Sequence, residues 1–287
     1  MWLSILIFLL SIVPSTLIIV WMYKRRKDNP LYKKACSRAL VSGIIDALPI
    51  LLLSGILYLL TAILKYSFFK DIPVLAYKAV YNFVVLAFVE EIIKYASFRL
   101  LLKHKKGPYS WSDLVALMIV IGTAFGLFED IPYAIGANAA TMLVRGFTMG
   151  HVGYAFIMGW FYGKSLYTGN KKYHAVAILL PWALHGLYDF SLSPELIQVN
   201  ELFMLIALAL AILDVILLVL MIRFFVRNRK HKIVRYRLSL FAVEPDDLPE
   251  ETAIPTAADA QEGTAENGEP QDTVSQPTEK TTPSDQV

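Results

Sequence analysis

Apolar residues come in long blocks along the chain, and short runs of charged and turn-forming residues separate these blocks. Each block approaches the roughly 20 residues that a helix needs to cross a hydrocarbon core of about 30 Å. We therefore expect an all-α, polytopic transmembrane helix bundle of about seven spans. The predicted spans are residues 2–23, 39–64, 77–102, 112–136, 145–164, 173–191 and 201–226.

The composition agrees with a membrane protein, because 56% of the 287 residues are hydrophobic and the mean hydropathy is +0.52. A soluble domain of this length needs fewer apolar residues to fill its core, so the excess is expected to face the lipid bilayer. The single cysteine, Cys36, excludes an internal disulfide and a cysteine-based zinc site. Any metal would therefore have to bind to His, Glu and Asp.

Basic residues gather in alternate connections between the predicted spans. The connections after spans one, three, five and seven are rich in Lys and Arg, whereas the other three hold few. This positive-inside pattern places the N-terminus outside a cell membrane and the C-terminus in the cytoplasm. The same pattern explains the basic excess, so no nucleic-acid partner is needed.

The C-terminal segment differs sharply from the rest of the chain. From residue 241 onward it holds 12 acidic residues and one Lys, and it is rich in Pro, Thr and Gln. Such a segment cannot bury enough apolar surface to offset its ordering entropy. We expect a transmembrane helical domain over 1–237 and a disordered, acidic cytoplasmic tail over 238–287.

Span three carries two adjacent carboxylates and a lysine, Glu90, Glu91 and Lys94, in an otherwise apolar helix. A charge at the bilayer centre costs at least about 2.5–3.5 kcal/mol on insertion scales, so this group requires an explanation. Lys94 lies three and four residues beyond the acids, which lets it pair with either. An ion pair that holds helices in register is one explanation, but it leaves the second glutamate unexplained.

Span four carries Glu129 shortly before Pro132, with Gly126 one turn earlier. An acid inside the membrane that faces a bundle interior is a candidate functional residue. Alternatively, Glu129 could pair with Arg145 at the start of the next span. Asp130 lies closer to the outer surface and is expected at the membrane interface.

Spans five and six each carry a histidine, His151 and His185. Because Asp189 follows His185 by four residues, both side chains lie on one helical face. This spacing suits two ligands of one metal, or a histidine oriented by a carboxylate. A single buried histidine such as His151 could equally be a hydrogen-bonded packing residue.

The depths of these residues allow them to meet. At about 1.5 Å per residue, Glu129, His151 and His185 lie roughly 9–12 Å below the outer boundary, and Glu90 roughly 15–20 Å. Four helices thus bring polar groups to one layer, which scattered structural ion pairs would not do.

Four motifs on successive helices together resemble those of a known family. In chain order they are Glu90-Glu91-x-x-Lys94, Phe125-x-x-x-Glu129, His151 and His185-x-x-x-Asp189. The ordered set resembles the PrsW family of bacterial intramembrane proteases, distant relatives of the CAAX prenyl proteases, over about residues 80–190. The resemblance implies an intramembrane endopeptidase that cuts membrane-anchored proteins near the extracytoplasmic side, with an anti-sigma factor as the type of substrate. Asp130 departs from the family pattern, in which Asn is commoner.

Peptide hydrolysis requires a water, a base, and positive charge or hydrogen-bond donors at the developing oxyanion. Glu90 or Glu91 would be the base, and Lys94 would keep the other glutamate ionised. The remaining residues would bind either a metal, for which zinc is suitable, or the water and oxyanion directly. These are His151, His185, Glu129 and Asp189, the last of which could instead orient His185. The sequence leaves the metal-dependent and purely glutamate-dependent versions open.

The same acids and histidines could serve a different class of protein. In a proton-coupled secondary transporter they would form a proton relay. Transporters usually contain an internal repeat of helices, and the sequence contains none that we recognise. A non-catalytic scaffold that binds membrane proteins is a third possibility.

Overall fold

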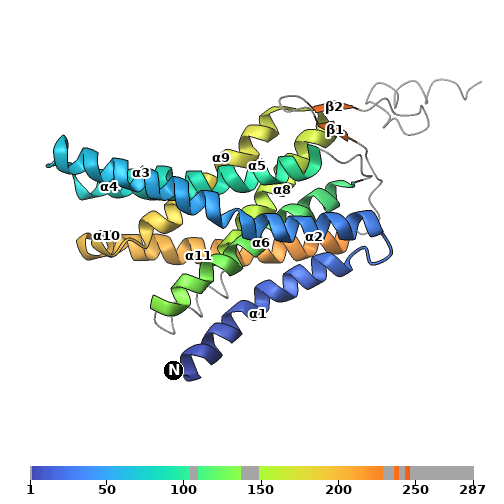
Figure 1. The fold of residues 1–287 in the computed structure, drawn as a ribbon, viewed down its shortest axis with the longest axis horizontal. Coiled ribbons are helices and arrows are strands. Elements are labelled where there is room, and N and C mark those ends of the chain that lie inside the picture. Colours follow the sequence, from blue (N-terminus) through green and yellow to red (C-terminus); the bar gives the residue numbers. More distant parts are fainter. Residues whose placement is uncertain (1, 104–108, 137–148, 229–235, 239–242, 246–287) are drawn as a thin grey trace, which may run out of the picture. The chain divides into compact units, whose positions relative to one another are not determined.

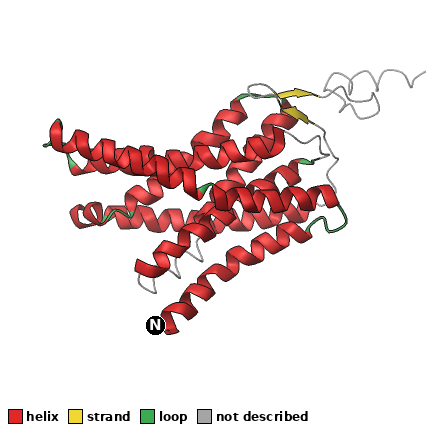
Figure 2. Ribbon diagram, viewed as in Figure 1, coloured by secondary structure: helices red, strands yellow, loops and turns green. Residues whose placement is uncertain are grey.

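The structure is a computed structural model that describes residues 2–103, 109–136, 149–228, 236–238 and 243–245. The described part is helical except for two three-residue strands, which confirms the predicted all-α class (Figures 1 and 2). The helices are α1 (Trp2–Lys24), α2 (Pro30–Ile45), α3 (Ala47–Ser67), α4 (Val74–Ala79), the π-helix η1 (Val80–Phe88), α5 (Val89–Lys103), α6 (Trp111–Gly136), α8 (Gly150–Thr168), α9 (Lys172–Ser191), α10 (Pro194–Val199) and α11 (Leu202–Arg227).

Each predicted span has a counterpart among these helices. Among the described residues, three helical stretches are long and apolar enough to cross a membrane, namely Pro30–Ser67, Trp111–Ile131 and Leu202–Arg227. The outer faces of α3 and α11 carry large apolar side chains, among which Leu51 is 74% exposed and Leu205 is 58% exposed. A continuous apolar surface of this kind is unfavourable in water and suits a face exposed to lipid.

The second predicted span is longer than expected and is divided into two helices. It begins at Pro30 because Asn29 caps the helix by accepting a hydrogen bond from the Tyr32 backbone N–H at 3.0 Å. It is interrupted at Asp46, which separates α2 from α3. Asp46 is buried, and the Ser97 hydroxyl of α5 donates a hydrogen bond to it at 2.5 Å. The interruption therefore links α2 and α3 to the helix that carries Glu90 and Glu91.

The third predicted span contains a π-helix, η1, which the apolar pattern did not reveal. Side chains from two neighbouring helices bind to its carbonyl groups. The Trp182 indole of α9 donates to the Phe83 carbonyl at 2.6 Å, and the Ser54 hydroxyl of α3 donates to the Val85 carbonyl at 2.9 Å. Segments of π-helix often accompany functional sites, and this one ends at Phe88, two residues before Glu90.

Helix α6 lies at the centre of the bundle and packs against α8, α2 and α1 (Figure 1). Its residues from Ser112 to Phe125 are all buried. Glycines in the partner helices permit close contact. A Cβ at Gly43 of α2 would lie 2.3 Å from the Ile121 carbonyl oxygen, and one at Gly159 of α8 would lie 2.9 Å from the Val115 Cα.

Ion pairs join the C-terminal end of α1 to the first turn of α6. Arg25 and Arg26 both contact the buried carboxylate of Asp113, the second at 2.9 Å. The Arg25 and Arg26 guanidinium groups also donate to the hydroxyls of Ser112 and Ser110, respectively. This cluster fixes the position of α1 relative to the central helix.

The two strands, β1 (Tyr236–Leu238) and β2 (Val243–Pro245), pair in antiparallel orientation. Strand β1 crosses the predicted boundary at residues 237 and 238, and β2 lies within the segment for which a disordered tail was predicted. The greater part of that predicted tail, residues 246–287, lies outside the described residues.

Candidate functional site

The first turn of α5 brings two carboxylates and one ammonium group together inside the bundle. Glu90, Glu91 and Lys94 are 8%, 1% and 1% exposed. The Lys94 ammonium lies 2.8 Å from Glu91 Oε1 and 3.4 Å from Glu90 Oε2, so it pairs with both acids. It also lies 4.3 Å from the centre of the Phe125 ring, at a distance typical of a cation–π interaction.

His185 of α9 lies between carboxylates on both of its ring nitrogens. Its Nδ1 atom is 3.0 Å from Glu91 Oε1, and its Nε2 atom is 3.2 Å from Asp189 Oδ2. The Nε2 atom is also 3.9 Å from Glu90 Oε2. Ionised carboxylates only accept hydrogen bonds, so two such contacts require either an imidazolium or one protonated carboxyl group.

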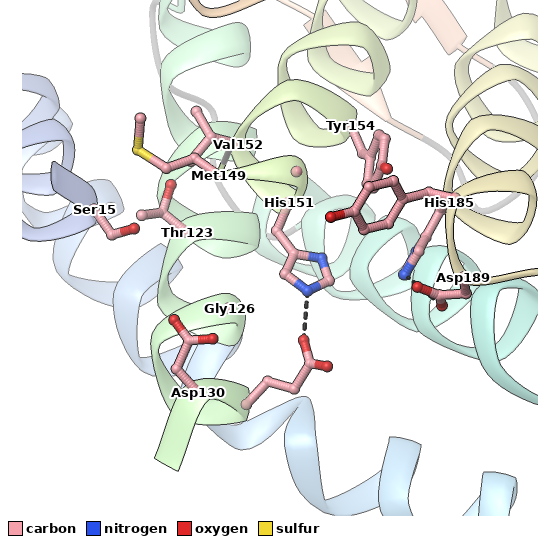
Figure 3. A pocket seen from close by; sticks show the side chains of 13 residues that line it. Ser15, Thr123, Gly126, Asp130, Met149, His151, Val152, Tyr154, His185 and Asp189 are labelled. Carbon is pink, nitrogen blue, oxygen red and sulfur yellow. Dashed lines mark hydrogen bonds and ion pairs between the residues drawn. The ribbon is translucent and has the colours of Figure 1, made fainter. Parts of the chain in front are cut away.

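His151 of α8 connects Lys94 to Glu129 of α6. Its Nδ1 atom is 3.1 Å from Lys94 Nζ. Its Nε2 atom is 2.5 Å from Glu129 Oε2, the contact that is dashed in Figure 3. An ammonium group can only donate, so Nδ1 is the acceptor and the ring proton lies on Nε2. The Nε2–H group then donates to Glu129, which fixes both the tautomer and the ring orientation of His151.

Glycines beside the two histidines leave room for the neighbouring side chains. A Cβ at Gly126 would lie 2.9 Å from His151 Cδ2, and one at Gly186 would lie 2.5 Å from Phe83 Cδ1. A larger residue at either position would displace its neighbour. The glycines therefore let α6 approach His151, and they let α9 present His185 to η1 and α5.

A pocket opens onto the histidines from the ends of α6 and α9 and the beginning of α8 (Figure 3). Helix α1 contributes Ser15 to its wall. The other residues that line it are Thr123, Gly126, Glu129, Asp130, Met149, Gly150, His151, Val152, Tyr154, His185, Tyr188 and Asp189. The sequence-predicted residues on these three helices thus share one pocket. Glu90, Glu91 and Lys94 do not line it, but they contact its two histidines.

As the sequence predicted, polar groups from α5, α6, α8 and α9 meet. Asp130, which the sequence predicted to lie at the membrane interface, is 8% exposed and lines the pocket. The alternative partner proposed for Glu129, Arg145, lies outside the described residues.

The donor set fits a divalent metal ion. Ligand atoms of Glu90, Glu91, His151 and His185 all lie within 4.8 Å of one another. Glu91 Oε2 is buried and has no hydrogen-bond partner among the described residues, as expected of an atom that could bind a cation. Imidazole and carboxylate groups are ligands that zinc accepts. Glu129 and Asp189, which the sequence analysis grouped with the histidines as ligands, lie outside this set and each hydrogen-bond one histidine.

Two residues near the site were missed by the sequence analysis. Tyr154 stacks on the His185 ring, with the ring centres 5.0 Å apart and the planes at 20°. An aromatic residue in an apolar helix carries no distinctive pattern. Asp214 of α11 is 3% exposed and follows twelve uncharged residues of the same helix. That signal was available, because a charge inside a membrane helix marks a functional candidate.

Comparison with known proteins finds a family model and two relatives that are all named as PrsW proteases. The model of the "PrsW family intramembrane metalloprotease" matches residues 34–222, which is more than half of the chain. A "Protease PrsW" of Clostridioides difficile (strain 630) is 29% identical over 204 residues, which cover 66% of this chain and 80% of the relative. A "Protease PrsW" of Geobacillus kaustophilus (strain HTA426) is 27% identical over 126 residues, which cover 42% of this chain and 55% of the relative. No solved structure matches the chain. These matches give no support to the transporter alternative.

Proposed function

We propose that this chain, which belongs to the PrsW family of intramembrane metalloproteases, cleaves membrane-anchored proteins near the extracytoplasmic side of the membrane. It is a membrane protein and a hydrolase of peptide bonds. The observation that carries the proposal is the meeting of Glu90, Glu91, His151 and His185 from three separate helices within 4.8 Å. An anti-sigma factor is the type of substrate that we propose.

The proposed topology has seven spans, with the N-terminus outside and the C-terminus in the cytoplasm of a cell membrane. The basic connections support this orientation, since positive loops remain on the cytoplasmic side. In this orientation the pocket opens toward the extracytoplasmic side, because it lies near the ends of α6 and α9. Residues 1–237 would form the protease domain, and 238–287 would form a disordered cytoplasmic tail that catalysis does not need.

We assign the role of general base to Glu90. Glu91 has closer partners, because its Oε1 atom contacts both Lys94 at 2.8 Å and His185 at 3.0 Å. Glu90 lies farther from both, at 3.4 Å and 3.9 Å, and it is the more exposed of the two. A carboxylate with weaker partners is better able to accept a proton.

Glu91 and Lys94 then act as an ion pair that shapes the site. The Lys94 ammonium keeps Glu91 ionised, and Glu91 in turn orients His185 through Nδ1. Asp189 and Glu129 orient the histidines through the Nε2 atoms of His185 and His151. Such carboxylate–histidine pairs fix the ring orientation and raise the basicity of the imidazole.

A metal would be held by Glu91 and by the Nδ1 atoms of His151 and His185, since the Nε2 atoms pair with Glu129 and Asp189. At His151 it would take the place of the Lys94 contact. When bound, a zinc ion would lower the pKa of a bound water to about 7 and polarise the substrate carbonyl. In the hydrolysis itself, Glu90 takes a proton from water as the water oxygen bonds to the scissile carbonyl carbon. Glu90 then returns this proton to the amide nitrogen as the C–N bond breaks, so that acid and amine products form.

A purified-protein assay tests the proposed function. The protein in detergent or liposomes is mixed with a single-span substrate that carries an extracytoplasmic segment, and the fragments are identified by mass spectrometry. We expect cleavage near the extracytoplasmic end of the span. Intact substrate with a folded enzyme would contradict the proposal, and so would cleavage on the cytoplasmic side.

A further inference from the structure

An acid without a role in the proposed mechanism lies in the middle of α11. Asp214 is the only charged residue between Glu201 and Arg223, and it is 3% exposed. A buried acid in a membrane helix is costly, and such residues usually mark functional sites. Its Oδ2 atom has no hydrogen-bond partner among the described residues, so no hydrogen bond offsets the cost at this atom. The presence of Asp214 therefore requires an explanation.

The Asp214 carboxylate faces the first turn of α8. A Cβ at Gly150 would lie 3.4 Å from Asp214 Oδ2, and one at Gly153 would lie 3.4 Å from Oδ1. The Leu217 side chain, one turn farther along α11, lies 3.2 Å from the same Gly153 position. The two glycines thus allow a carboxylate to approach the helix backbone at van der Waals distance.

This turn of α8 carries two residues of the site and begins in a strained conformation. Met149, which precedes the helix, has φ +49°. This left-handed conformation is unfavourable for any residue that has a side chain. His151 and Tyr154 follow within the next turn. A strained backbone persists only where its surroundings hold it. Asp214 packs against Gly150, the residue that follows Met149.

The charge of Asp214 suits this position. The first N–H groups of a helix have no partner within the helix, and they give its N-terminus a partial positive charge. A carboxylate beside the first turn is therefore attracted to it. Among the described residues, Asp214 lies outside the set of four that could share a metal ion, so a ligand role does not explain it.

We propose that Asp214 is a positioning residue. Its carboxylate, packed on Gly150 and Gly153, holds the strained beginning of α8 and so keeps His151 between Lys94 and Glu129. The effect on turnover rests on the proposed proteolytic function, whereas the effect on α8 does not.

The test compares Asp214→Asn, which keeps the shape but removes the charge, with Val215→Asn. Val215 is the next residue of α11 and is 48% exposed, so its variant controls for an added amide in this helix. Two quantities are measured on the full-length protein: kcat and KM for a single-span substrate, and amide hydrogen exchange over residues 149–154. For Asp214→Asn we expect kcat to fall about 10- to 100-fold at unchanged KM, because small displacements of catalytic groups have effects of this size.

Exchange over residues 149–154 should be faster in Asp214→Asn and unchanged in Val215→Asn. Unchanged kcat, or unchanged exchange in this turn, would overturn the proposal. Faster exchange throughout the bundle would also overturn it, because the acid would then support the whole fold. Gly153→Ala should reproduce the local effect, since its Cβ would crowd Leu217. If the unaltered protein cleaves nothing, the proposed function fails, and the exchange measurement alone decides the role of Asp214.

Discussion

Lys94 is the residue that makes two adjacent acids compatible with the interior of the bundle. Its ammonium contacts both carboxylates and the Nδ1 atom of His151. The whole Lys94 side chain is only 2% exposed. Removing one partner of a buried ion pair commonly costs about 3–5 kcal/mol, because the other charge is left without compensation. Loss of Glu91 should therefore lower the stability of the protein more than loss of Glu90.

Glu90→Gln should lower proteolysis by about 10²-fold or more, since general-base catalysis typically contributes 10²–10⁴. Glu91→Gln should also lower it, because Lys94 and His185 lose the carboxylate that holds them in place. The Glu91 variant should also unfold at a lower temperature, because Glu91 has the shorter contact with Lys94. Glu201→Gln, at the beginning of α11, provides a control outside the site. Cleavage rates and thermal unfolding in detergent separate the two effects. Full activity in both variants would refute the assignment of the pair.

Replacing either histidine of the site by alanine should lower metal content and activity together. Ligand number sets metal affinity, so loss of His151 or His185 would be seen by elemental analysis as well as by assay. His174→Ala is the matched control, because His174 lies on α9 with His185 and its partner is Ser165. A fully active sample without stoichiometric metal would exclude the metal version. A glutamate-activated water held by the histidines would then remain.

At the scale of helices, the site depends on how closely neighbouring backbones approach. Helix α6 meets α8 through Gly122 and Gly126, and a Cβ at Gly122 would lie 2.6 Å from the Ala155 Cβ. Interfaces between membrane helices use small residues in this way. The geometry of the site should thus be sensitive to a single methyl group at a helix crossing.

Gly126→Ala should lower kcat by about 10²-fold, because the added Cβ would press on His151 Cδ2 and shift the ring. Gly55→Ala makes the same change in α3, where nothing lies within 4 Å of the added atom. That control should retain full activity. Equal activity in the two variants would show that a shift of the His151 ring does not change kcat.

The attachment of α1 to α6 should contribute to stability and not to chemistry. Asp113→Asn removes the charge that Arg25 and Arg26 share. We expect a loss of about 1–3 kcal/mol in the free energy of unfolding, since the arginines are partly exposed and the aspartate is buried. The folded fraction should keep its kcat. Measured per folded molecule, a large loss of kcat would instead link α1 to catalysis.

For the whole molecule, the orientation in the membrane decides on which side substrates are cut. In a Cys36→Ser background, a cysteine at Ala139 should react with a membrane-impermeant reagent added outside, and one at Asn170 should not. The basic connections provide the physical reason, because they resist translocation. The opposite labelling pattern would place the pocket on the cytoplasmic side.

Apolar blocks predicted the helices, and misplaced charges selected residues that the structure brings together, because both are strong signals in a membrane protein. Glu90, Lys94, His151 and His185 could be chosen since each interrupts an apolar helix. The interruption at Asp46 and the π-helix η1 could not be predicted. A shift of one residue in the backbone hydrogen bonds leaves the apolar pattern unchanged.

The ligand partners were harder to predict than the residues themselves. Helical spacing paired His185 with Asp189, and that contact exists. The contact of His185 Nδ1 with Glu91 joins residues 94 positions apart. It depends on the packing of α9 on η1 and α5, which no local pattern encodes. Long-range contacts of this kind therefore determine which carboxylates can share a metal with the histidines.

The ion pairs within α5 also bear on how the protein is made. Glu90, Glu91 and Lys94 pair at three- and four-residue spacings, so their contacts form as soon as this helix coils. His151 follows Lys94 by 57 residues and is synthesised later. While α5 leaves the ribosome and enters the translocon, its own lysine already offsets one of its two negative charges, which reduces the cost of moving the segment into lipid. The nascent chain can thus deliver a preformed acidic pair into the membrane, and the histidines of α8 and α9 complete the site when they arrive.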